Sequence, residues 1–164
     1  MIIKNLRGDI WEEMIDVEEK SISQFKPLTH SLIVVMYKEK SLLVFNRFKK
    51  HWELPGGMID PGETARECSI RELKEEANQV VDNPIFIGVM KFLLAPDHWN
   101  KVVRTEYGTL FYSDINSENA FKENEEMSGL CFWNGVDDIG KIEPIDAKMI
   151  EIAKEGRKSR RQRA

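Results

Sequence analysis

The sequence has little of what would place it among disulfide-bonded or zinc-binding proteins. Its 164 residues include two cysteines, Cys68 and Cys131, which lie far apart and form no CxxC motif. Such sparse cysteine is typical of reduced residues in a cytosolic protein. Three histidines are present without the spacing of metal ligands, so a zinc site is not expected: His30, His51 and His98.

Long hydrophobic runs are also missing. The longest, from Leu32 to Tyr37, is far too short to span a bilayer. The first residues lack the apolar core of a signal peptide. We therefore expect a cytoplasmic protein without a membrane segment.

A strong excess of one charge is absent too. The net charge of −4 argues against nucleic-acid binding by the whole surface, although not against a local patch. Basic residues are concentrated in 157–164, after Gly156, and we expect this tail to be disordered and to follow a single domain at 1–156. The tail is either simply solvated or contacts phosphates of RNA. The sequence leaves monomer and homodimer both open.

What remains is an alternation of apolar runs and two helical patterns, which predicts an α/β (α+β) layer protein. Met1–Pro27 fits either a strand pair or a short helix. Strands are expected at 31–37 and 41–46, joined by a tight turn, and at 84–95, 102–115 and 130–133. Helices are expected from 63 or 64 to 77 and at 144–154, the second ended by Gly156.

The most informative stretch runs from Gly56 to Val81. Its helix carries Glu72, Glu75 and Glu76, which share or adjoin one face because residues three and four apart are neighbours on a helix. Like charges so close repel each other by roughly a few tenths of a kcal/mol per pair. A bound cation would offset this repulsion, and hard carboxylate ligands suit Mg²⁺ or Mn²⁺.

This stretch resembles the signature of the Nudix hydrolases, Gx5Ex7REUxEExGU, in which U is a bulky aliphatic residue. Gly57 opens the motif, Glu63 follows after five residues, and Arg71–Glu76 reads RELKEE. Two positions depart from it. Asn78 replaces glycine, which is a mild change because a left-handed helix end accepts Asn next after Gly. Gln79 replaces an aliphatic residue, and Val80 or Val81 is expected to fill that apolar position instead.

The resemblance implies a mixed β-sheet sandwiched between the signature helix and the C-terminal helix. It also implies that Glu72 and Glu76 are the main Mg²⁺ ligands, with Glu75 as a further ligand or just behind them, and with the carbonyl of Gly56 as a backbone ligand. Arg71 and Glu63 would form an orienting ion pair. A distant loop often adds one more acid, and the string EEMSGLCFW points to Glu126 rather than Glu123 or Glu125.

The implied activity is hydrolysis of a pyrophosphate bond in a nucleoside triphosphate or nucleoside diphosphate derivative, with cleansing of 8-oxo-dGTP favoured. ADP-ribose hydrolysis is the close alternative, because Pro96 lies near the position of a proline found in such enzymes. Cleavage at the 5′ end of RNA is a third, supported by the basic loop 47–50 and the basic tail. A non-catalytic nucleotide sensor is least expected, since every signature acid is present. Three residues are candidates for substrate binding: Arg47, Trp52 and Trp99.

Overall fold

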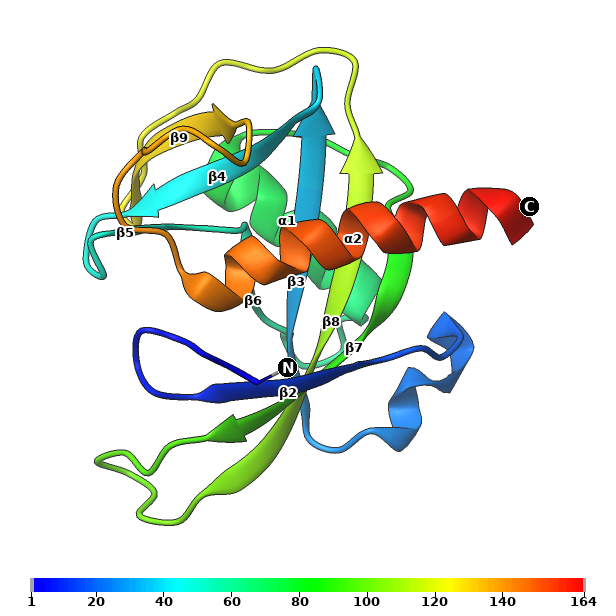
Figure 1. The fold of residues 1–164 in the computed structure, drawn as a ribbon, viewed down its shortest axis with the longest axis vertical. Coiled ribbons are helices and arrows are strands. Elements are labelled where there is room, and N and C mark those ends of the chain that lie inside the picture. Colours follow the sequence, from blue (N-terminus) through cyan, green and yellow to red (C-terminus); the bar gives the residue numbers. More distant parts are fainter. Residues whose placement is uncertain (1, 164) are drawn as a thin grey trace.

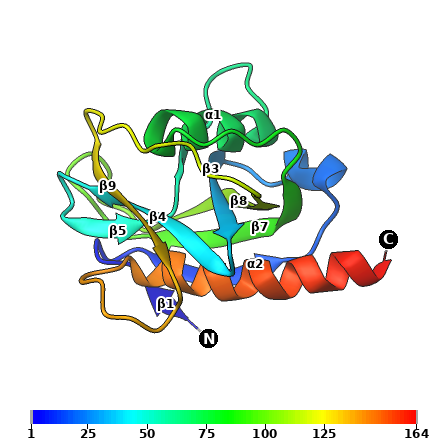
Figure 2. The same ribbon diagram turned by 90° about the horizontal axis from the view of Figure 1, so that it is seen from above.

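The computed structural model describes residues 2–163, with side chains through residue 160. A single sheet lies between two helices, α1 (Ala65–Ala77) on one face and α2 (Pro144–Arg163) on the other (Figures 1 and 2). A short 3-10 helix, η1, spans Glu19–Gln24. The strands are β1 (Ile3–Lys4), β2 (Ile10–Ile15), β3 (Leu28–Tyr37), β4 (Lys40–Asn46), β5 (His51–Glu53), β6 (Gly56–Met58), β7 (Ile85–Leu94), β8 (Arg104–Asp114) and β9 (Met127–Trp133).

The sheet is mixed. Its strands run in the order β1-β2-β7-β8-β3-β4-β5, with β6 added to β3 and β9 added to β4. The β3–β8 pair is parallel, whereas the other strand pairs are antiparallel. The expected mixed sheet sandwiched between two helices is therefore confirmed.

Each face of the sheet buries its own apolar cluster. Leu73 and Ala77 of α1 pack with Ile33 and Val35 of β3 on one face. Alternate residues of the same strand point the other way, because side chains alternate across a strand. Accordingly the cluster on the other face contains Val34 and Met36 together with α2 residues, among them Met149 and Ala153.

The N-terminal 27 residues, for which the sequence left two possibilities, contain both. β1 and β2 form an antiparallel pair, β2 continues the sheet beside β7, and η1 follows. The hairpin expected between 31–37 and 41–46 is present, with Tyr37 opposite Lys40. Its two turn residues, Lys38 and Glu39, both have positive φ, of 50° and 64°, as a two-residue hairpin of type I′ requires.

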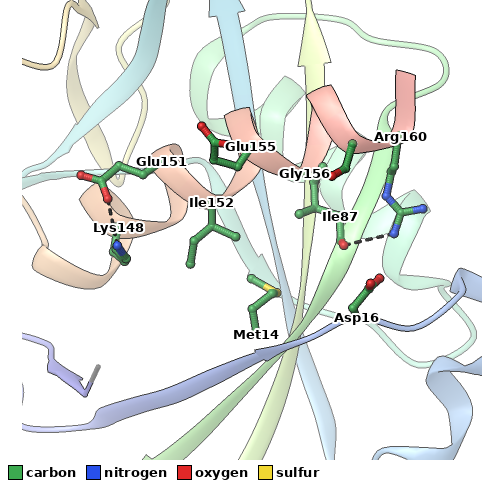
Figure 3. Close-up of a pocket in the computed structure, with 10 residues that line it drawn as sticks. Met14, Asp16, Ile87, Lys148, Glu151, Ile152, Glu155, Gly156 and Arg160 are labelled. Carbon is green, nitrogen blue, oxygen red and sulfur yellow. Dashed lines mark hydrogen bonds and ion pairs between the residues drawn. The ribbon is translucent and has the colours of Figure 1, made fainter. Parts of the chain in front are cut away.

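The prediction that Gly156 ends the last helix, leaving 157–164 disordered, is wrong for the residues described. α2 continues to Arg163. Gly156 lies so close over β7 that a Cβ atom would come within 2.9 Å of Cγ2 of Ile87. Beyond it, Nη2 of Arg160 donates to the carbonyl oxygen of Ile87 at 3.1 Å (Figure 3), and Arg157 pairs with Asp114 at 2.7 Å. Tertiary contacts therefore sustain the helix past the glycine. Residue 164 lies outside the described residues.

Among the described residues, no helix combines the length and apolar character needed to cross a membrane.

Candidate active site

The helix α1 begins and ends with local signals that the sequence displays. The hydroxyl of Thr64 accepts from the backbone N–H of Glu67, whose carboxylate in turn accepts from the Thr64 N–H, both at 3.1 Å. Such a capping box fixes the first turn of a helix. At the other end Asn78 takes the left-handed conformation, with φ of 56°, and its N–H donates to the Lys74 carbonyl oxygen. The substitution of Asn for Gly thus preserves the helix end.

The second departure from the signature, Gln79, is a polar anchor. Its side chain is buried, donates 2.8 Å to the carbonyl oxygen of Asn119, and accepts 2.8 Å from the Asn119 N–H. These bonds attach the loop before β9 to the end of α1. Val81 is buried in the apolar cluster, whereas Val80 is 56% exposed, so Val81 fills the apolar position.

Arg71 connects the acidic residues of the signature. Its Nε and Nη2 donate to the two carboxylate oxygens of Glu63 at 2.6 and 2.9 Å, and this pairing lowers the pKa of Glu63 to about 2. Its Nη1 donates to Glu72 at 2.9 Å and to Glu75 at 3.1 Å. The geometry contains the expected Arg71–Glu63 pair and extends it to two acids of the helix.

The two glycines of β6 let backbone and acids approach closely. A Cβ atom on Gly57 would lie 2.5 Å from Oε1 of Glu72, and one on Gly56 would collide with the carbonyl oxygen of Ser31. The N–H of Gly56 donates 2.8 Å to Oε1 of Glu76. Because Gly56 and Gly57 have no side chains, the carboxylates of Glu72 and Glu76 can lie directly against the backbone of β6.

Glu76 is the most deeply placed of these acids, with only 4% of its surface exposed. Burial raises its pKa to about 9; the Gly56 N–H opposes this shift, while the nearby Glu72, Glu126 and Glu53 carboxylates add to it. Carboxylate oxygens from Glu53, Glu76 and Glu126 all lie within 4.8 Å of one another. Three carboxylates this close repel one another when all are charged, and either protonation or a bound cation would relieve that repulsion.

Glu53, at the end of β5, belongs to this cluster although sequence reasoning did not select it. Nδ2 of Asn46 bridges Glu53 and Glu126, at 3.1 and 3.3 Å, and Nε2 of His51 lies 2.8 Å from the other Glu53 oxygen. The sequence offered one signal, an acidic residue inside the short extended segment that leads into the glycines. Its partner Asn46 is supplied by the neighbouring strand β4.

The three helix acids and Glu126 line one open pocket of about 600 Å³. Burial raises the pKa of Glu72, opposed by Arg71. Phe48, which is 71% exposed, and Lys49 line the same pocket. Of the expected ligands, the side chains of Glu72, Glu75, Glu76 and Glu126 are thus brought together, whereas Gly56 contributes its N–H to Glu76 and lines the adjoining pocket.

The three residues expected to bind substrate lie elsewhere. Arg47 ties down the loop before β9, donating 2.7 Å to Glu123 and 2.8 Å to the Asn124 carbonyl oxygen. The indole of Trp52 donates to the Ile139 carbonyl oxygen at 2.8 Å and packs against Phe45. Trp99 is 90% exposed. The aromatic residue in the lining of the acidic pocket is instead Phe48.

A second, smaller pocket of about 210 Å³ adjoins the acids, with Glu53, Gly56 and Gly57 in its lining. Its far wall contains two carboxyl groups. Asp146 accepts 2.8 Å from the Leu54 N–H and burial raises its pKa well above the usual range. Burial also raises the pKa of Glu143. The remaining lining includes Asn5, His30, Leu32 and Phe92.

Comparison with known proteins agrees with this geometry. The family model described as NUDIX domain matches residues 27–154. “Uncharacterized Nudix hydrolase YvcI” of Bacillus subtilis is 29% identical over 126 residues, 75% of this chain and 77% of that protein. “Putative 8-oxo-dGTP diphosphatase” of the same species is 31% identical over 99 residues, 60% of each chain.

Solved structures extend the likeness to most of the fold. The crystal structure of a mutant of the Bacillus subtilis pyrophosphohydrolase BsRppH superposes with a TM-score of 0.70, covering 97% of this chain and 96% of that one at 16% identity. At 16% identity this match supports the fold alone, and the assignment to a family rests on the family model. The chain belongs to the Nudix family of hydrolases, pyrophosphohydrolases that act on phosphorus-containing anhydrides.

Proposed function

We propose that this chain is a Mg²⁺-dependent hydrolase that cleaves a pyrophosphate bond in a nucleoside triphosphate or a nucleoside diphosphate derivative, with 8-oxo-dGTP among the candidate substrates. One observation carries the proposal. Glu76, held by the Gly56 N–H at 2.8 Å, has carboxylate oxygens of Glu53 and Glu126 within 4.8 Å. The relative named for 8-oxo-dGTP supports the choice of a nucleotide.

The donor set fits a hard divalent cation. All the side-chain donors are carboxylate oxygens, and no cysteine or histidine belongs to the cluster of Glu53, Glu76 and Glu126, which favours Mg²⁺ or Mn²⁺ over zinc. Burial raises the pKa of Glu76 to about 9, and the negative charges of Glu72, Glu126 and Glu53 add to this shift, so a cation bound among these carboxylates would stabilise the charged form of Glu76. Glu72 and Glu75 line the same pocket and complete the acidic wall.

Within this site the residues have separable tasks. Bound Mg²⁺ would neutralise phosphate oxygens and lower the pKa of a coordinated water. Arg71 holds Glu72 and Glu75 in place through Nη1 and is itself held by Glu63. Asn46 keeps Glu53 and Glu126 at a fixed separation. Lys49 lines the pocket with its Nζ 3.6 Å from Oε2 of Glu53, and so brings a positive charge beside the acids that a polyphosphate would approach.

The 210 Å³ pocket beside the glycines is placed to take the nucleoside. It shares Glu53 with the acidic cluster and is also lined by Gly56, whose N–H donates to Glu76, so a group bound there would lie next to the pyrophosphate. Asp146 contributes a buried carboxyl group to this pocket, and burial raises its pKa. The phenyl ring of Phe92 supplies an apolar surface.

The test is a hydrolysis panel. Purified protein is incubated with Mg²⁺ and each of the following: the common triphosphates, 8-oxo-dGTP, ADP-ribose, dinucleoside polyphosphates and triphosphorylated RNA. Release of phosphate, pyrophosphate or the nucleoside monophosphate is then measured. We expect Mg²⁺-dependent cleavage that a chelator abolishes, with one nucleotide class preferred. Absence of cleavage of every substrate, with either Mg²⁺ or Mn²⁺, would overturn the proposal.

A further inference from the structure

Lys49 lies where three pockets meet. It lines the acidic pocket beside α1, the 210 Å³ pocket beside the glycines, and a third pocket of about 430 Å³. The second and third pockets also share Asn5 and Glu143. The three pockets therefore adjoin one another, and the third borders the nucleoside pocket along three shared residues.

The charged side chains differ between the first and the third pocket. The acidic pocket is lined by five glutamates and one lysine. The third pocket is lined by Arg7, Lys49 and Lys141 with a single carboxylate, Glu143, and by Asn5, Leu6 and His51. Arg7 is paired with Asp9, and Nζ of Lys49 lies 3.6 Å from Oε2 of Glu53, so Lys141 adds a positive charge without a salt bridge to a described carboxylate; in a chain with net charge −4, the three cations together form a local site for an anion.

Three distant segments build this basic pocket, and hydrogen bonds fix each of them. In the segment of Lys49, its backbone N–H donates 3.0 Å to Oδ1 of Asn46. Arg7 donates through Nε and Nη2 to Oδ2 of Asp9, at 2.8 and 2.6 Å, and Asp9 is anchored in turn by the Ala95 N–H. The carbonyl oxygen of Lys141 accepts 2.9 Å from the Trp52 N–H. The positions of the cations are thus set by the fold, although the Lys141 side chain itself is exposed.

The side chain of Lys141 forms no salt bridge with another described residue. An exposed lysine is ordinarily just solvated. Here it shares a concavity with Arg7 and Lys49, and that concavity continues into the pocket proposed for the nucleoside. The nucleoside pocket contains Glu53 of the acidic cluster at one side and shares Asn5 and Glu143 with the pocket of the cations, which favours the order acids, nucleoside, cations.

We propose that the pocket of Arg7, Lys49 and Lys141 binds a second phosphate group of the substrate, carried on the 3′ side of the nucleoside whose 5′ pyrophosphate is cleaved. This inference rests on the proposed function. The order of the pockets matches the order of groups in such a molecule: pyrophosphate, nucleoside, 3′-phosphate. The group belongs either to a small 3′-phosphorylated nucleotide or to the first phosphodiester of an oligonucleotide.

Kinetics with three substrates of the same base test the proposal: a nucleoside triphosphate, its 3′-phosphorylated form and a triphosphorylated dinucleotide. We expect the 3′-phosphate to raise kcat/KM about tenfold, and Lys141→Glu to remove most of that gain, because a reversed charge repels the phosphate. Lys101→Glu, which makes the same charge change outside these three pockets, serves as the control and should preserve the gain.

Each outcome of these kinetic measurements leads to a different conclusion. Equal gains for the mononucleotide and the dinucleotide assign the effect to the phosphate itself, whereas a larger gain for the dinucleotide identifies an oligonucleotide as the natural source. No gain from either overturns the proposal. It is also overturned if Lys141→Glu lowers kcat/KM equally for all three substrates, since the pocket would then serve the polyphosphate chain.

A binding measurement keeps this inference distinct from the proposed function. Calorimetric titration compares adenosine 3′-monophosphate with adenosine, in wild type and in Lys141→Glu, and needs no turnover. We expect wild type to bind the 3′-phosphate about tenfold more tightly than the nucleoside, and the variant to lose this preference. If no substrate is hydrolysed but this preference is present, the proposed function fails while the phosphate site stands. Equal affinities in wild type overturn the site.

Discussion

The backbone N–H of Gly56 donates a 2.8 Å hydrogen bond to Oε1 of Glu76. This bond joins the glycine corner to the middle of the signature helix and orients a carboxylate that is only 4% exposed. A buried acid kept next to Glu53 and Glu126 is costly for folding. We infer that the acid is retained for cation binding rather than for stability.

Replacing Glu76 with Gln separates these two roles. The amide oxygen of Gln can still accept from the Gly56 N–H, and helix propensity hardly changes. The variant should therefore keep or exceed the wild-type melting temperature. Its turnover should fall at least about 100-fold, since the variant lacks a carboxylate that we propose as a metal ligand. Thermal unfolding and steady-state kinetics on the same preparation check both statements, and wild-type turnover would refute the assignment of Glu76.

The raised pKa of Glu76 predicts how stability depends on pH in metal-free protein. Its pKa is about 9 in the folded state against 4.5 for an unperturbed glutamate. Between these values the folded chain binds more protons than the unfolded chain, so the free energy of unfolding falls as pH rises. The contribution is fully present below pH 4.5 and is lost as pH rises through about 9.

Denaturant unfolding at several pH values between 5 and 9, in a chelator, measures this slope, which is at most about 1.4 kcal/mol per pH unit for one group. Glu72 and Asp146 also have raised pKa values and contribute to the wild-type slope. The difference between wild type and Glu76→Gln isolates the one residue, and we expect the variant to have the flatter profile. Parallel profiles would contradict the prediction.

Glu53 offers a test of the cluster that the signature alone did not identify. Glu53→Gln keeps the shape of the side chain and can still accept from Nδ2 of Asn46, but it removes one negative charge beside Glu76 and Glu126. We expect Mn²⁺ affinity, followed by electron paramagnetic resonance or calorimetry, to fall about tenfold or more. Glu125→Gln is the matched control, because Glu125 lines the same pocket outside the three-acid cluster. Equal effects of the two changes would remove Glu53 from the site.

The contrast between Glu53 and the signature acids indicates what the sequence can predict. Local spacing places Glu72 and Glu76 on one face of a helix, so their proximity follows from the helical period. Glu63 precedes that helix, and its pairing with Arg71 is implied by the resemblance to the Nudix signature. The position of Glu53 depends on the pairing of β4 with β5, which brings Asn46 to it. Lys49, Arg7 and Lys141 meet through contacts across the whole chain. Contacts between residues so far apart in the chain produce no local pattern in the amino-acid sequence from which they could be predicted.

The same limit explains the error at the C-terminus. A glycine followed by basic residues is locally a helix end, and the rule that predicted it considers only neighbours in sequence. In the structure Gly156 is the residue that lets α2 approach Ile87 of β7. Arg157 then pairs with Asp114, and its guanidinium group lies over the ring of Tyr112 at 5.2 Å. Packing on the sheet outweighs the local preference, which costs only about 1 kcal/mol for a glycine within a helix.

Substitution of Gly156 tests this account of α2. Alanine raises helix propensity by about 1 kcal/mol, yet its Cβ would lie 2.9 Å from Cγ2 of Ile87, and overpacking of this kind costs about 1–3 kcal/mol. We expect Gly156→Ala to lower the free energy of unfolding. In an Ile87→Ala background the obstructing methyl group is gone, so the same change should become neutral or stabilising. Denaturant unfolding of the four proteins forms a double-mutant cycle. If alanine at 156 acted alike in both backgrounds, the close approach of Gly156 to Ile87 would not be what maintains the helix against the sheet.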